Sequence, residues 1–289
     1  MIIVKIWEGL GNQMFQYAFA RTLKELGQEV YISSDKIENS LIPVKVNRKY
    51  ALNAFCISIP NKNLKKSFKW RFIERSNLLQ RLIFKVAQKK IFPIHVIEDI
   101  KSPYQFHAEF LNPYRNTCFI GFFQNYKYFN KIRTILISEF SLKQKYDIPK
   151  ELEEILQNEQ TVAIHIRRGD YVKNRFAIDN TQYYQKAMQY IEKNIHQPTY
   201  IIFSDDIEWV KKNLQLCNKK IYVDRSMKLK EYEELNLMSR CKHNIIANST
   251  FSWWGAWLNQ NTDKIVVAPR IWLGSKSKGF IVPEEWHCI

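Results

Sequence analysis

The second half of the chain alternates short apolar segments with longer amphipathic ones, and this alternation constrains its fold more than any other feature. Apolar, strand-like runs occupy residues 162–166, 200–203, 221–223, 244–247 and 265–268. Helical periodicity falls between or after them, near residues 182–194, 207–216, 230–239 and 250–258. Strands that alternate with helices predict an α/β domain with a parallel, doubly wound sheet.

The N-terminus predicts a second unit of the same kind. Residues 1–6 are apolar and β-branched, and a turn containing Gly9 and Gly11 separates them from a helical pattern over residues 13–26. Gly27 is placed to end that helix, and another strand is expected at residues 30–32. A strand, a glycine turn, a helix and a strand form a Rossmann-like βαβ unit.

We therefore expect two Rossmann-like domains, which suits a chain of 289 residues at roughly 150 residues per domain. The acidic stretch of residues 147–154 is the candidate boundary. It divides the chain into residues 1–150 and residues 151–289. Residues 91–146 are aromatic-rich and weakly periodic, and they support no assignment of individual elements.

The chain is strongly basic, with 44 Lys and Arg against 28 Asp and Glu, a net charge of +16. This predicts an anionic partner: nucleic acid, a membrane surface or a phosphate-bearing ligand. Ten basic residues and one acidic residue fall within residues 61–90, interleaved with apolar side chains. The segment is either a helix with a solvated cationic face or one that docks on anionic lipid. A nucleic-acid-binding function is disfavoured, because the charge is concentrated there and no nucleic-acid module is recognised.

The sequence contains no segment expected to direct secretion or to span a membrane. Lys5, Glu8, Asn12 and Gln13 interrupt the apolar N-terminus, and no apolar run approaches about 18 residues. The five cysteines are widely spaced, which favours reduced thiols over a disulfide framework or a zinc site. We expect a cytoplasmic protein, peripheral on the inner membrane if the basic segment contacts lipid.

Polar clusters follow three of the predicted strands. Arg167, Arg168, Gly169 and Asp170 follow the first, Ser204, Asp205 and Asp206 the second, and Asn248, Ser249, Thr250, Phe251 and Ser252 the fourth. The carboxyl ends of parallel strands meet at one edge of a sheet, where open α/β sheets bind ligands. We therefore expect these clusters to lie together.

Their chemistry suits a nucleotide with a diphosphate. Paired arginines bind phosphate oxygens in a bidentate manner, and hydroxyl and N–H groups at a helix N-terminus bind anions. Asp205 is suited to accept hydrogen bonds from a guanine edge or from a ribose. Each cluster also has a structural interpretation: a surface arginine pair, an N-cap in the Asn-Ser-Thr sequence, and a cap of the following helix at Asp205 and Asp206. His165 is either a core residue or a contact of the nucleotide.

Four motifs, taken in order along the chain, resemble the bacterial α-1,2-fucosyltransferases of glycosyltransferase family 11. They are G-L-G-N-Q at residues 9–13, H-I-R-R-G-D at 165–170, F-S-D-D at 203–206 and N-S-T-F-S-W-W-G-A-W at 248–257. The second is also similar to an element of α-1,6-fucosyltransferases and protein O-fucosyltransferases. The resemblance extends from residue 1 to about residue 268, with gaps in the middle.

This resemblance implies a GT-B fold, with two Rossmann-like domains facing across a cleft. It implies a galactoside α-1,2-fucosyltransferase that inverts the anomeric centre, with GDP-fucose held by residues 151–289 and the glycan acceptor on the side of residues 1–150. It also implies no metal and no other cofactor, and the sequence contains no D-x-D motif. A fucosyltransferase of another linkage, or one using another GDP-sugar, is the alternative.

The resemblance also assigns roles to residues. Arg167 would stabilise the charge that develops on the β-phosphate, with Arg168 supporting phosphate or structure. Asn12, next to Gly11, would face the donor near the fucose or diphosphate; the alternative is that Asn12 caps its helix. The remaining contacts would be His165 and Asp205 to the nucleoside and Asn248, Ser249, Thr250 and Phe251 to phosphates or base. Asp170 is a candidate catalytic base or orders the arginine loop, and Asp179 is the other candidate base.

Overall fold

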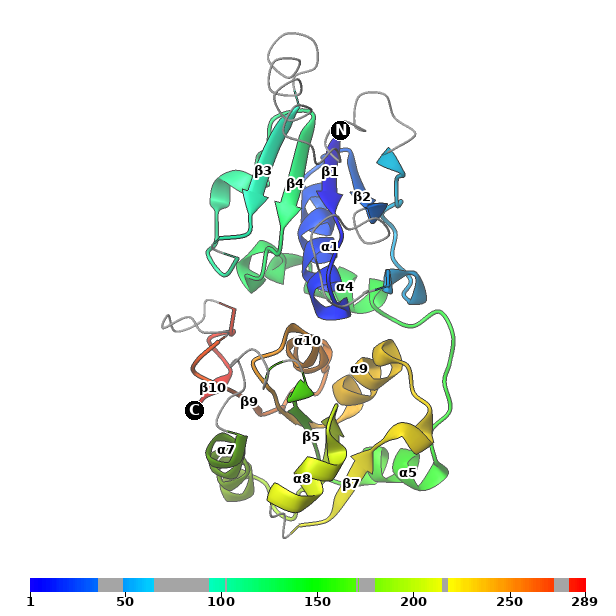
Figure 1. Cartoon of the computed structure of the whole chain (residues 1–289), viewed down its shortest axis with the longest axis vertical. Coiled ribbons are helices and arrows are strands. Elements are labelled where there is room, and N and C mark those ends of the chain that lie inside the picture. The colour runs from blue at the N-terminus through cyan, green and yellow to red at the C-terminus, as the bar shows by residue number, and fades with distance from the viewer. Residues whose placement is uncertain are drawn as a thin grey trace. The chain divides into compact units, whose positions relative to one another are not determined.

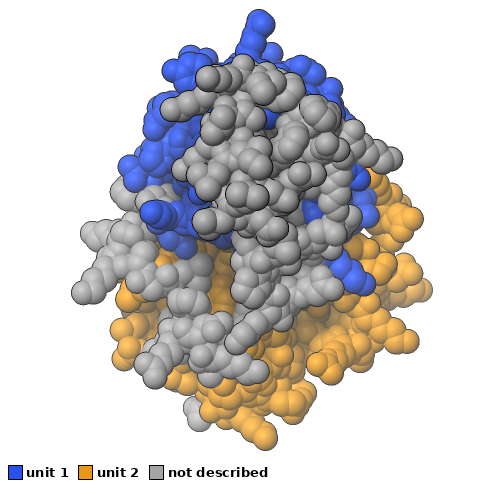
Figure 2. All heavy atoms as spheres, turned by 45° about the horizontal axis from the view of Figure 1, so that its top comes forward, with its two compact units in different colours: residues 1–141 blue, residues 142–289 orange. Residues whose placement is uncertain are grey.

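The computed structural model describes residues 1–35, 49–64, 94–101, 103–169, 171, 180–214, 218–272 and 281–289. The chain divides into two compact units, Met1–Ser141 and Leu142–Ile289, coloured separately in Figure 2. Every strand pairing in both units is parallel, which confirms the α/β class with Rossmann-like sheets. The acceptor-side and donor-side roles expected for residues 1–150 and 151–289 stay predictions.

The first unit has a four-stranded sheet in the order β2-β1-β4-β3 (Figure 1). Its strands are β1 (Ile2–Lys5), β2 (Val30–Ser33), β3 (His95–Asp99) and β4 (Thr117–Gly121). Its helices are α1 (Leu10–Glu25), α4 (Arg133–Glu139) and the 3-10 helices η1 (Leu52–Ala54), η4 (Ala108–Leu111), η5 (Tyr126–Tyr128) and η6 (Asn130–Ile132). Helix α1 joins β1 to β2, which confirms the predicted N-terminal βαβ unit.

Helix α1 begins at Leu10, three residues before the start expected from the sequence. Gly9 is its N-cap, and the N–H groups of Asn12 and Gln13 donate to the Gly9 carbonyl at 2.9 and 3.0 Å. Gly11 and Asn12 therefore lie inside the first helical turn, and Asn12 does not cap the helix. The expected end is confirmed, because Gly27 has a φ of +81°, a conformation that glycine adopts without strain.

Strands β3 and β4 lie in the region that the sequence left unassigned. One face of β4, at Phe119, packs in an aromatic cluster that carries little periodicity, and Cys118 on its other face packs with Ile3 and Ile94. Phe19 of α1 stacks on Phe123 at 4.2 Å between ring centroids and meets Phe119 edge-to-face at 4.9 Å. Tyr128 adds a second edge contact to Phe19 at 5.2 Å. Aromatic pairs of this geometry contribute about 0.5–1.5 kcal/mol each beyond burial, so this cluster fixes the chain that follows β4.

The second unit has a six-stranded sheet in the order β10-β9-β8-β5-β6-β7. Its strands are β5 (Thr161–Ile166), β6 (Thr199–Ser204), β7 (Lys220–Val223), β8 (His243–Ile245), β9 (Val266–Ala268) and β10 (His287–Cys288). Its helices are α5 (Lys150–Asn158), α7 (Asn180–Asn194), α8 (Ile207–Asn213), α9 (Glu231–Arg240), α10 (Thr250–Leu258) and the 3-10 helix η7 (Arg225–Met227). All five predicted strands and all four predicted helices are present. The two-residue β10 was not predicted, nor was helix α5, which occupies part of the acidic stretch expected to hold the domain boundary.

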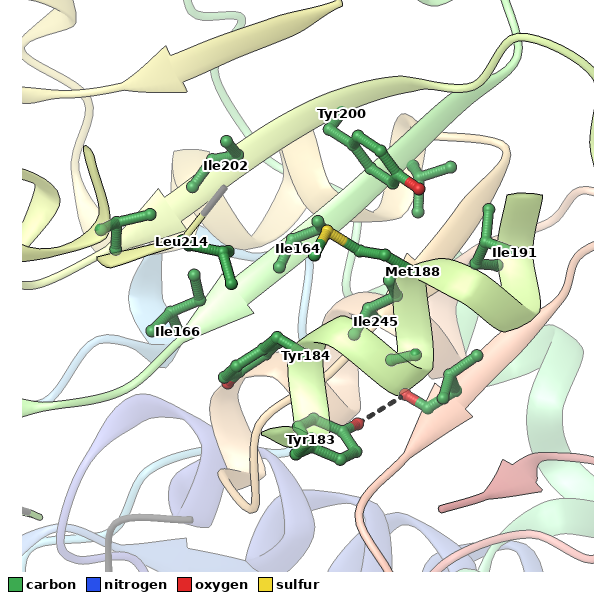
Figure 3. Close-up of a cluster of buried hydrophobic side chains, with 14 residues drawn as sticks. Ile164, Ile166, Tyr183, Tyr184, Met188, Ile191, Tyr200, Ile202, Leu214 and Ile245 are labelled. Carbon is green, nitrogen blue, oxygen red and sulfur yellow. Dashed lines mark hydrogen bonds between the residues drawn. The ribbon is translucent and has the colours of Figure 1, made fainter. Parts of the chain in front are cut away.

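Both faces of this sheet are covered by apolar side chains. Ile164 of β5 and Ile202 of β6 pack on one face, where Tyr184 and Met188 of α7 point toward them (Figure 3). Ala163 of β5 and Ile201 and Phe203 of β6 pack on the other face, against α5 and α9. Burying one such large side chain contributes about 1.5–3 kcal/mol. With both faces filled, polar side chains collect at the edge of the sheet instead.

Several sequence-based predictions fall wholly or partly outside the described residues. These are the helix expected within residues 61–90, most of it in the undescribed range 65–93, together with Asp170, Asp179 and Cys217. The cysteines that the structure describes, Cys56, Cys118, Cys241 and Cys288, are free thiols. In the described part of the chain, no helix is both long and apolar enough to cross a membrane.

Asp99, the last residue of β3, carries a buried carboxyl group whose ionisation destabilises the fold. Burial raises the pKa of Asp99 from 3.8 to about 6, and its Oδ2 accepts a hydrogen bond from the N–H of Phe123 at 3.0 Å. Because the folded protein binds the proton more tightly than the unfolded chain, this group lowers stability as pH rises through the range from about 4 to 6.

Replacement of Asp99 with asparagine keeps an acceptor for Phe123 and removes the ionisation. We expect the free energy of unfolding of Asp99→Asn, relative to wild type, to increase by about 1 kcal/mol or more between pH 5 and pH 8. Urea denaturation at the two pH values measures the difference. A difference between the proteins that stays constant with pH would show that burial does not perturb this carboxyl group.

Candidate active site

The three polar clusters meet at the carboxyl edge of the sheet in the second unit. Strands β5, β6 and β8 are neighbours, with Ile166 paired to Ser204 and Ile164 paired to Ile245. The residues that follow these strands therefore leave the sheet at one edge, as predicted from the parallel arrangement. An ion pair joins the first two clusters, and His165 and Tyr171, which flank the first cluster, contact the third.

Asp205, at the end of β6, holds the loop that follows β5. Its Oδ2 lies 3.0 Å from Nη1 of Arg167, and its Oδ1 accepts a hydrogen bond from the N–H of Arg168 at 2.9 Å. A Cβ on Gly169 would lie 2.7 Å from the same Oδ2, so only glycine fits beside this carboxylate without displacing a side chain. Asp205 thus fixes the guanidinium of Arg167 and the backbone of the loop together. Its expected contact with a nucleoside stays a prediction, since carboxylate oxygens accept several hydrogen bonds.

Arg168 is tied to the segment that follows β6. Its Nε donates to Oδ2 of Asp206 at 3.2 Å, and its Cζ lies 3.6 Å from the centre of the Trp209 ring. Asp206 is also the N-cap of α8, with Oδ1 accepting from the N–H of Trp209 at 3.2 Å. The capping role considered for this Asp pair is therefore confirmed for Asp206. The stacked and paired geometry of Arg168 favours its structural role over free access to phosphate.

His165, in β5, is a neutral imidazole with an unused ring nitrogen. It is 6% exposed, and Nδ1 has no hydrogen-bond partner among the described residues. Burial and then the charge of Arg167 lower the pKa of His165 to about 3, so the ring is uncharged near neutral pH. A buried nitrogen without a partner costs about 1–3 kcal/mol, which a core histidine would normally avoid. A ligand that hydrogen-bonds to Nδ1 would remove that cost.

The N-terminus of α10 completes this edge. Ser249 is the N-cap, its side chain makes no capping hydrogen bond, and no acidic residue occupies the first turn. Phe251 lies 5.6 Å from His165 between ring centroids, and Tyr171 donates to the Asn248 carbonyl at 3.4 Å while its ring lies 5.6 Å from Arg167. The helix dipole and the N–H groups of Thr250 and Phe251 favour an anion here. Ser249, Thr250 and Phe251 thus lie where the sequence predicts them.

Burial of α10 fixes its direction. Trp253, Trp254 and Trp257 form a mutually packed cluster, and Trp253 Nε1 donates to the carbonyl of Ile281 at 2.8 Å. A Cβ on Gly255 would lie 2.9 Å from Cβ of Met238, so glycine allows α9 and α10 to approach closely. The W-W-G-A-W part of the motif is therefore structural, and it aims the N-terminus of the helix at the edge of the sheet.

Glu234 is a candidate that the sequence analysis missed. It lies in the first turn of α9, which begins at the carboxyl edge because it leads back to the start of β8. Burial raises the pKa of Glu234 to about 7, and the charge of Glu231 adds to the effect. Glu234 is one of three acidic residues in this turn, and the sequence alone does not show that its pKa is raised.

In the first unit, Asn12 lies at the N-terminus of α1, where β1 ends. Its Oδ1 accepts a hydrogen bond from Nε2 of Gln124 at 2.7 Å, and the side chain is half-buried. Gly11 is buried in the same helical turn. Among the described residues, no group of three or more His, Cys, Asp or Glu side chains is placed to hold a metal ion.

Two units with parallel, Rossmann-like sheets, one of them with an arginine pair and a helix N-terminus along its carboxyl edge, are typical of the GT-B-type fold of glycosyltransferases. The fold is similar to that of Arabidopsis thaliana FUT1 in complex with GDP, with a TM-score of 0.52 and 11% identity over 92% of this chain and 69% of that one. The chain belongs to glycosyl transferase family 11, whose model matches residues 98–288.

Two relatives from Escherichia coli match nearly the whole chain. The O-antigen biosynthesis glycosyltransferase WbnK is 33% identical over 96% of this chain and 97% of its own length. An alpha-1,2-colitosyltransferase is 30% identical over 99% of this chain and 98% of its own length. The mouse (Mus musculus) galactoside 2-alpha-L-fucosyltransferase Sec1 is 20% identical over 89% of this chain and 64% of its own length.

Proposed function

We propose that this protein transfers fucose from GDP-fucose to a galactose-type hydroxyl of a glycan and forms an α-1,2 linkage with inversion. The observation that carries the proposal is the Arg167 guanidinium, which Asp205 holds at the edge where α10 presents its N-terminus. Membership of family 11 and the names of the relatives support the same activity.

In the proposed reaction the bond between fucose and the β-phosphate breaks as the acceptor hydroxyl attacks from the opposite face. Negative charge grows on the β-phosphate, and Arg167 stabilises it; one such donor typically supplies about 3–4 kcal/mol of barrier lowering. The N–H groups that open α10, with Ser249 and Thr250, bind the diphosphate. Asn12 directs its side-chain N–H groups to the fucose or diphosphate. The proton of the acceptor hydroxyl would pass to a carboxylate, for which Asp170 and Asp179 are the candidates.

The nucleoside would be recognised at His165 and Phe251. The unused Nδ1 of the neutral imidazole is suited to a polar atom of the base or ribose, and the Phe251 ring to packing on the base. Asp205, whose Oδ1 already accepts from the N–H of Arg168, is the carboxylate that suits the N–H groups of a guanine edge. A guanine-specific site follows, because adenine and uracil do not present the same pair of donors.

A different sugar on the same GDP carrier is the second candidate. The colitosyltransferase relative is 30% identical over almost the whole chain, similar to the identity shown by WbnK. Arg167 and α10 would bind the diphosphate of either donor in the same way, so the choice of sugar depends on other residues.

We also propose that the protein works in the cytoplasm, and that the basic segment of residues 61–90 brings it to a lipid-carried acceptor at an anionic membrane surface.

Chelation is expected to leave GDP-fucose binding and transfer unchanged. The reason is that a fixed guanidinium and helix N–H groups neutralise the diphosphate in this proposal, a task that metal-dependent enzymes assign to a divalent ion. Titration calorimetry with GDP-fucose and a transfer assay, each with and without EDTA, measure the effect. Loss of activity in EDTA with recovery on addition of Mn²⁺ or Mg²⁺ would disprove metal independence.

A further inference from the structure

We propose that Gln124 is a positioning residue for the transfer reaction: it fixes the orientation of the Asn12 carboxamide so that the N–H groups of Asn12 point to the substrate. The inference rests on the proposed role of Asn12 and adds a residue from the turn that follows β4. The contact that suggests it is the hydrogen bond from Nε2 of Gln124 to Oδ1 of Asn12 at 2.7 Å.

The turn that carries Gln124 is rigidly built. Phe123 has a φ of +50°, in the left-handed region that bulky residues rarely adopt, and its ring is completely buried. Asp99 accepts from the N–H of Phe123 at 3.0 Å, and the N–H of Gln124 donates to the Pro103 carbonyl at 2.8 Å. Strained backbone of this kind persists only where its surroundings hold it, and it is enriched at functional sites. The backbone at Gln124 is therefore fixed, and this fixes the direction in which its side chain projects from the turn.

The contact controls which end of the Asn12 amide is available. A carboxamide has one acceptor oxygen and one NH₂ donor group, and turning it by half a rotation exchanges them. With its oxygen bonded to Gln124, Asn12 presents NH₂ on its other side. NH₂ is the end that suits a phosphate or a sugar hydroxyl. The reversed amide would present an oxygen and repel a diphosphate.

The fold does not depend on this contact, because two other glutamines anchor the start of α1 to backbone atoms. Gln13 binds the carbonyls of Glu8 and Lys49 and the N–H of Ala51. Gln16 accepts from the N–H of Trp7 at 2.9 Å and donates to the Gly121 carbonyl at 3.0 Å. The contact between Gln124 and Asn12 instead joins two side chains. The Asn12 side chain is half-buried in the first turn of α1. Its loss should therefore appear in catalysis more than in stability.

The test compares Gln124→Glu with Asn12→Ala and with the double variant. Glutamate keeps the size of the side chain and an acceptor but has no N–H to give to Asn12. We expect kcat to fall about tenfold in Gln124→Glu, the scale of one misdirected polar contact. Because Gln124 is buried, the new carboxylate should also lower the melting temperature. Gln124→Met removes the N–H without adding a charge, and it should show the same loss of kcat with a melting temperature closer to that of wild type. In the Asn12→Ala background the Gln124 substitution should cause no further loss, because Gln124 acts through Asn12. Gln105→Glu, the same change at an exposed position of this unit, is the control and should retain wild-type turnover.

A second readout needs no substrate. In ¹⁵N-labelled protein, the side-chain NH₂ signals that disappear in Asn12→Ala identify Asn12, and these signals should shift in Gln124→Glu. Wild-type turnover of Gln124→Glu, unshifted Asn12 signals, or losses that multiply in the double variant would each overturn the inference. If GDP-fucose supports no transfer at all, the proposed function fails while the NMR result still decides this proposal. If kcat falls in Asn12→Ala but not in Gln124→Glu, Asn12 keeps its proposed role and Gln124 is not a positioning residue.

Discussion

Replacing Arg167 with alanine is expected to reduce kcat for transfer by at least two orders of magnitude while the protein stays folded. In the proposed mechanism the guanidinium meets the negative charge that develops on the leaving diphosphate, and removal of one such donor typically costs a factor of about 100 to 1,000. The side chain is partly exposed at the edge of the sheet and supports no part of the apolar core, so the melting temperature should change little. Steady-state kinetics and thermal melting of the purified variant measure both effects.

The conservative substitution sharpens this prediction. Arg167→Lys keeps a positive charge but loses the planar fork that binds Asp205 and a phosphate oxygen together, so it should recover only part of the lost activity. Wild-type turnover in either variant would remove Arg167 from the catalytic role. A large loss of stability in Arg167→Ala would instead mean that the ion pair with Asp205 is mainly structural.

Substitution of Asp205 with asparagine is expected to lower kcat by about 10- to 100-fold. The amide oxygen can still accept from the N–H of Arg168, but its NH₂ group would face Nη1 of Arg167 and push the guanidinium away. A hydrogen bond to a charged group contributes about 1.5–3 kcal/mol, which corresponds to this range of rates. Kinetics of Asp205→Asn, compared with Arg167→Ala and the double variant, measure the coupling.

Asp206→Asn is the matched control for that experiment. Asparagine caps a helix about as well as aspartate, and the pair between Asp206 and Arg168 is partly exposed and of small energetic value. The control should therefore lose less than about threefold in kcat, on the scale of a surface ion pair. If Asp205→Asn is no worse than the control, or if its effect multiplies with that of Arg167→Ala, Asp205 does not act by positioning Arg167.

The second unit was largely predictable from the sequence because its strands are buried on both faces. Runs such as residues 200–203 are apolar throughout, and the polar residues that end them mark the edge of the sheet. Helix α10 was predicted with its observed limits, Thr250–Leu258, because Ser249 and the Trp-rich face define both its start and its burial. The parallel order of the strands likewise predicts that Arg167, Asp205 and Ser249 lie at one edge, where they are found.

The first unit was less predictable, for physical reasons that particular residues illustrate. Leu10, Gly11 and Asn12 belong to α1, since side chains of Gln13 and Gln16 hold a turn that glycine propensity alone argues against. Strand β4 contributes Phe119 to an aromatic cluster around Phe19, and such packing has no sequence period. The pairing of Asn12 with Gln124 joins residues more than a hundred positions apart, and no local pattern reports such a contact.

In the second unit, the sequence could not show how the polar groups pair. Asp205 and Asp206 are adjacent and chemically identical, yet one holds Arg167 and the other caps α8. Glu234 is one of three glutamates at the start of α9, and their spacing does not show that the pKa of this one is raised. Such distinctions depend on the direction of each side chain at the edge of the sheet, which the spacing of residues does not determine.

The measurement that tests the central claim most directly is transfer from a panel of nucleotide sugars to a β-galactoside, with the product analysed by mass spectrometry and its linkage by NMR. GDP-fucose, GDP-linked colitose, GDP-mannose and UDP-galactose make up the panel, each assayed with wild type and with Arg167→Ala. We predict that GDP-fucose gives an α-1,2-linked product and free GDP, and that this reaction is lost in Arg167→Ala. A product formed only from one of the other donors, or fucose transfer that persists without Arg167, would contradict the account.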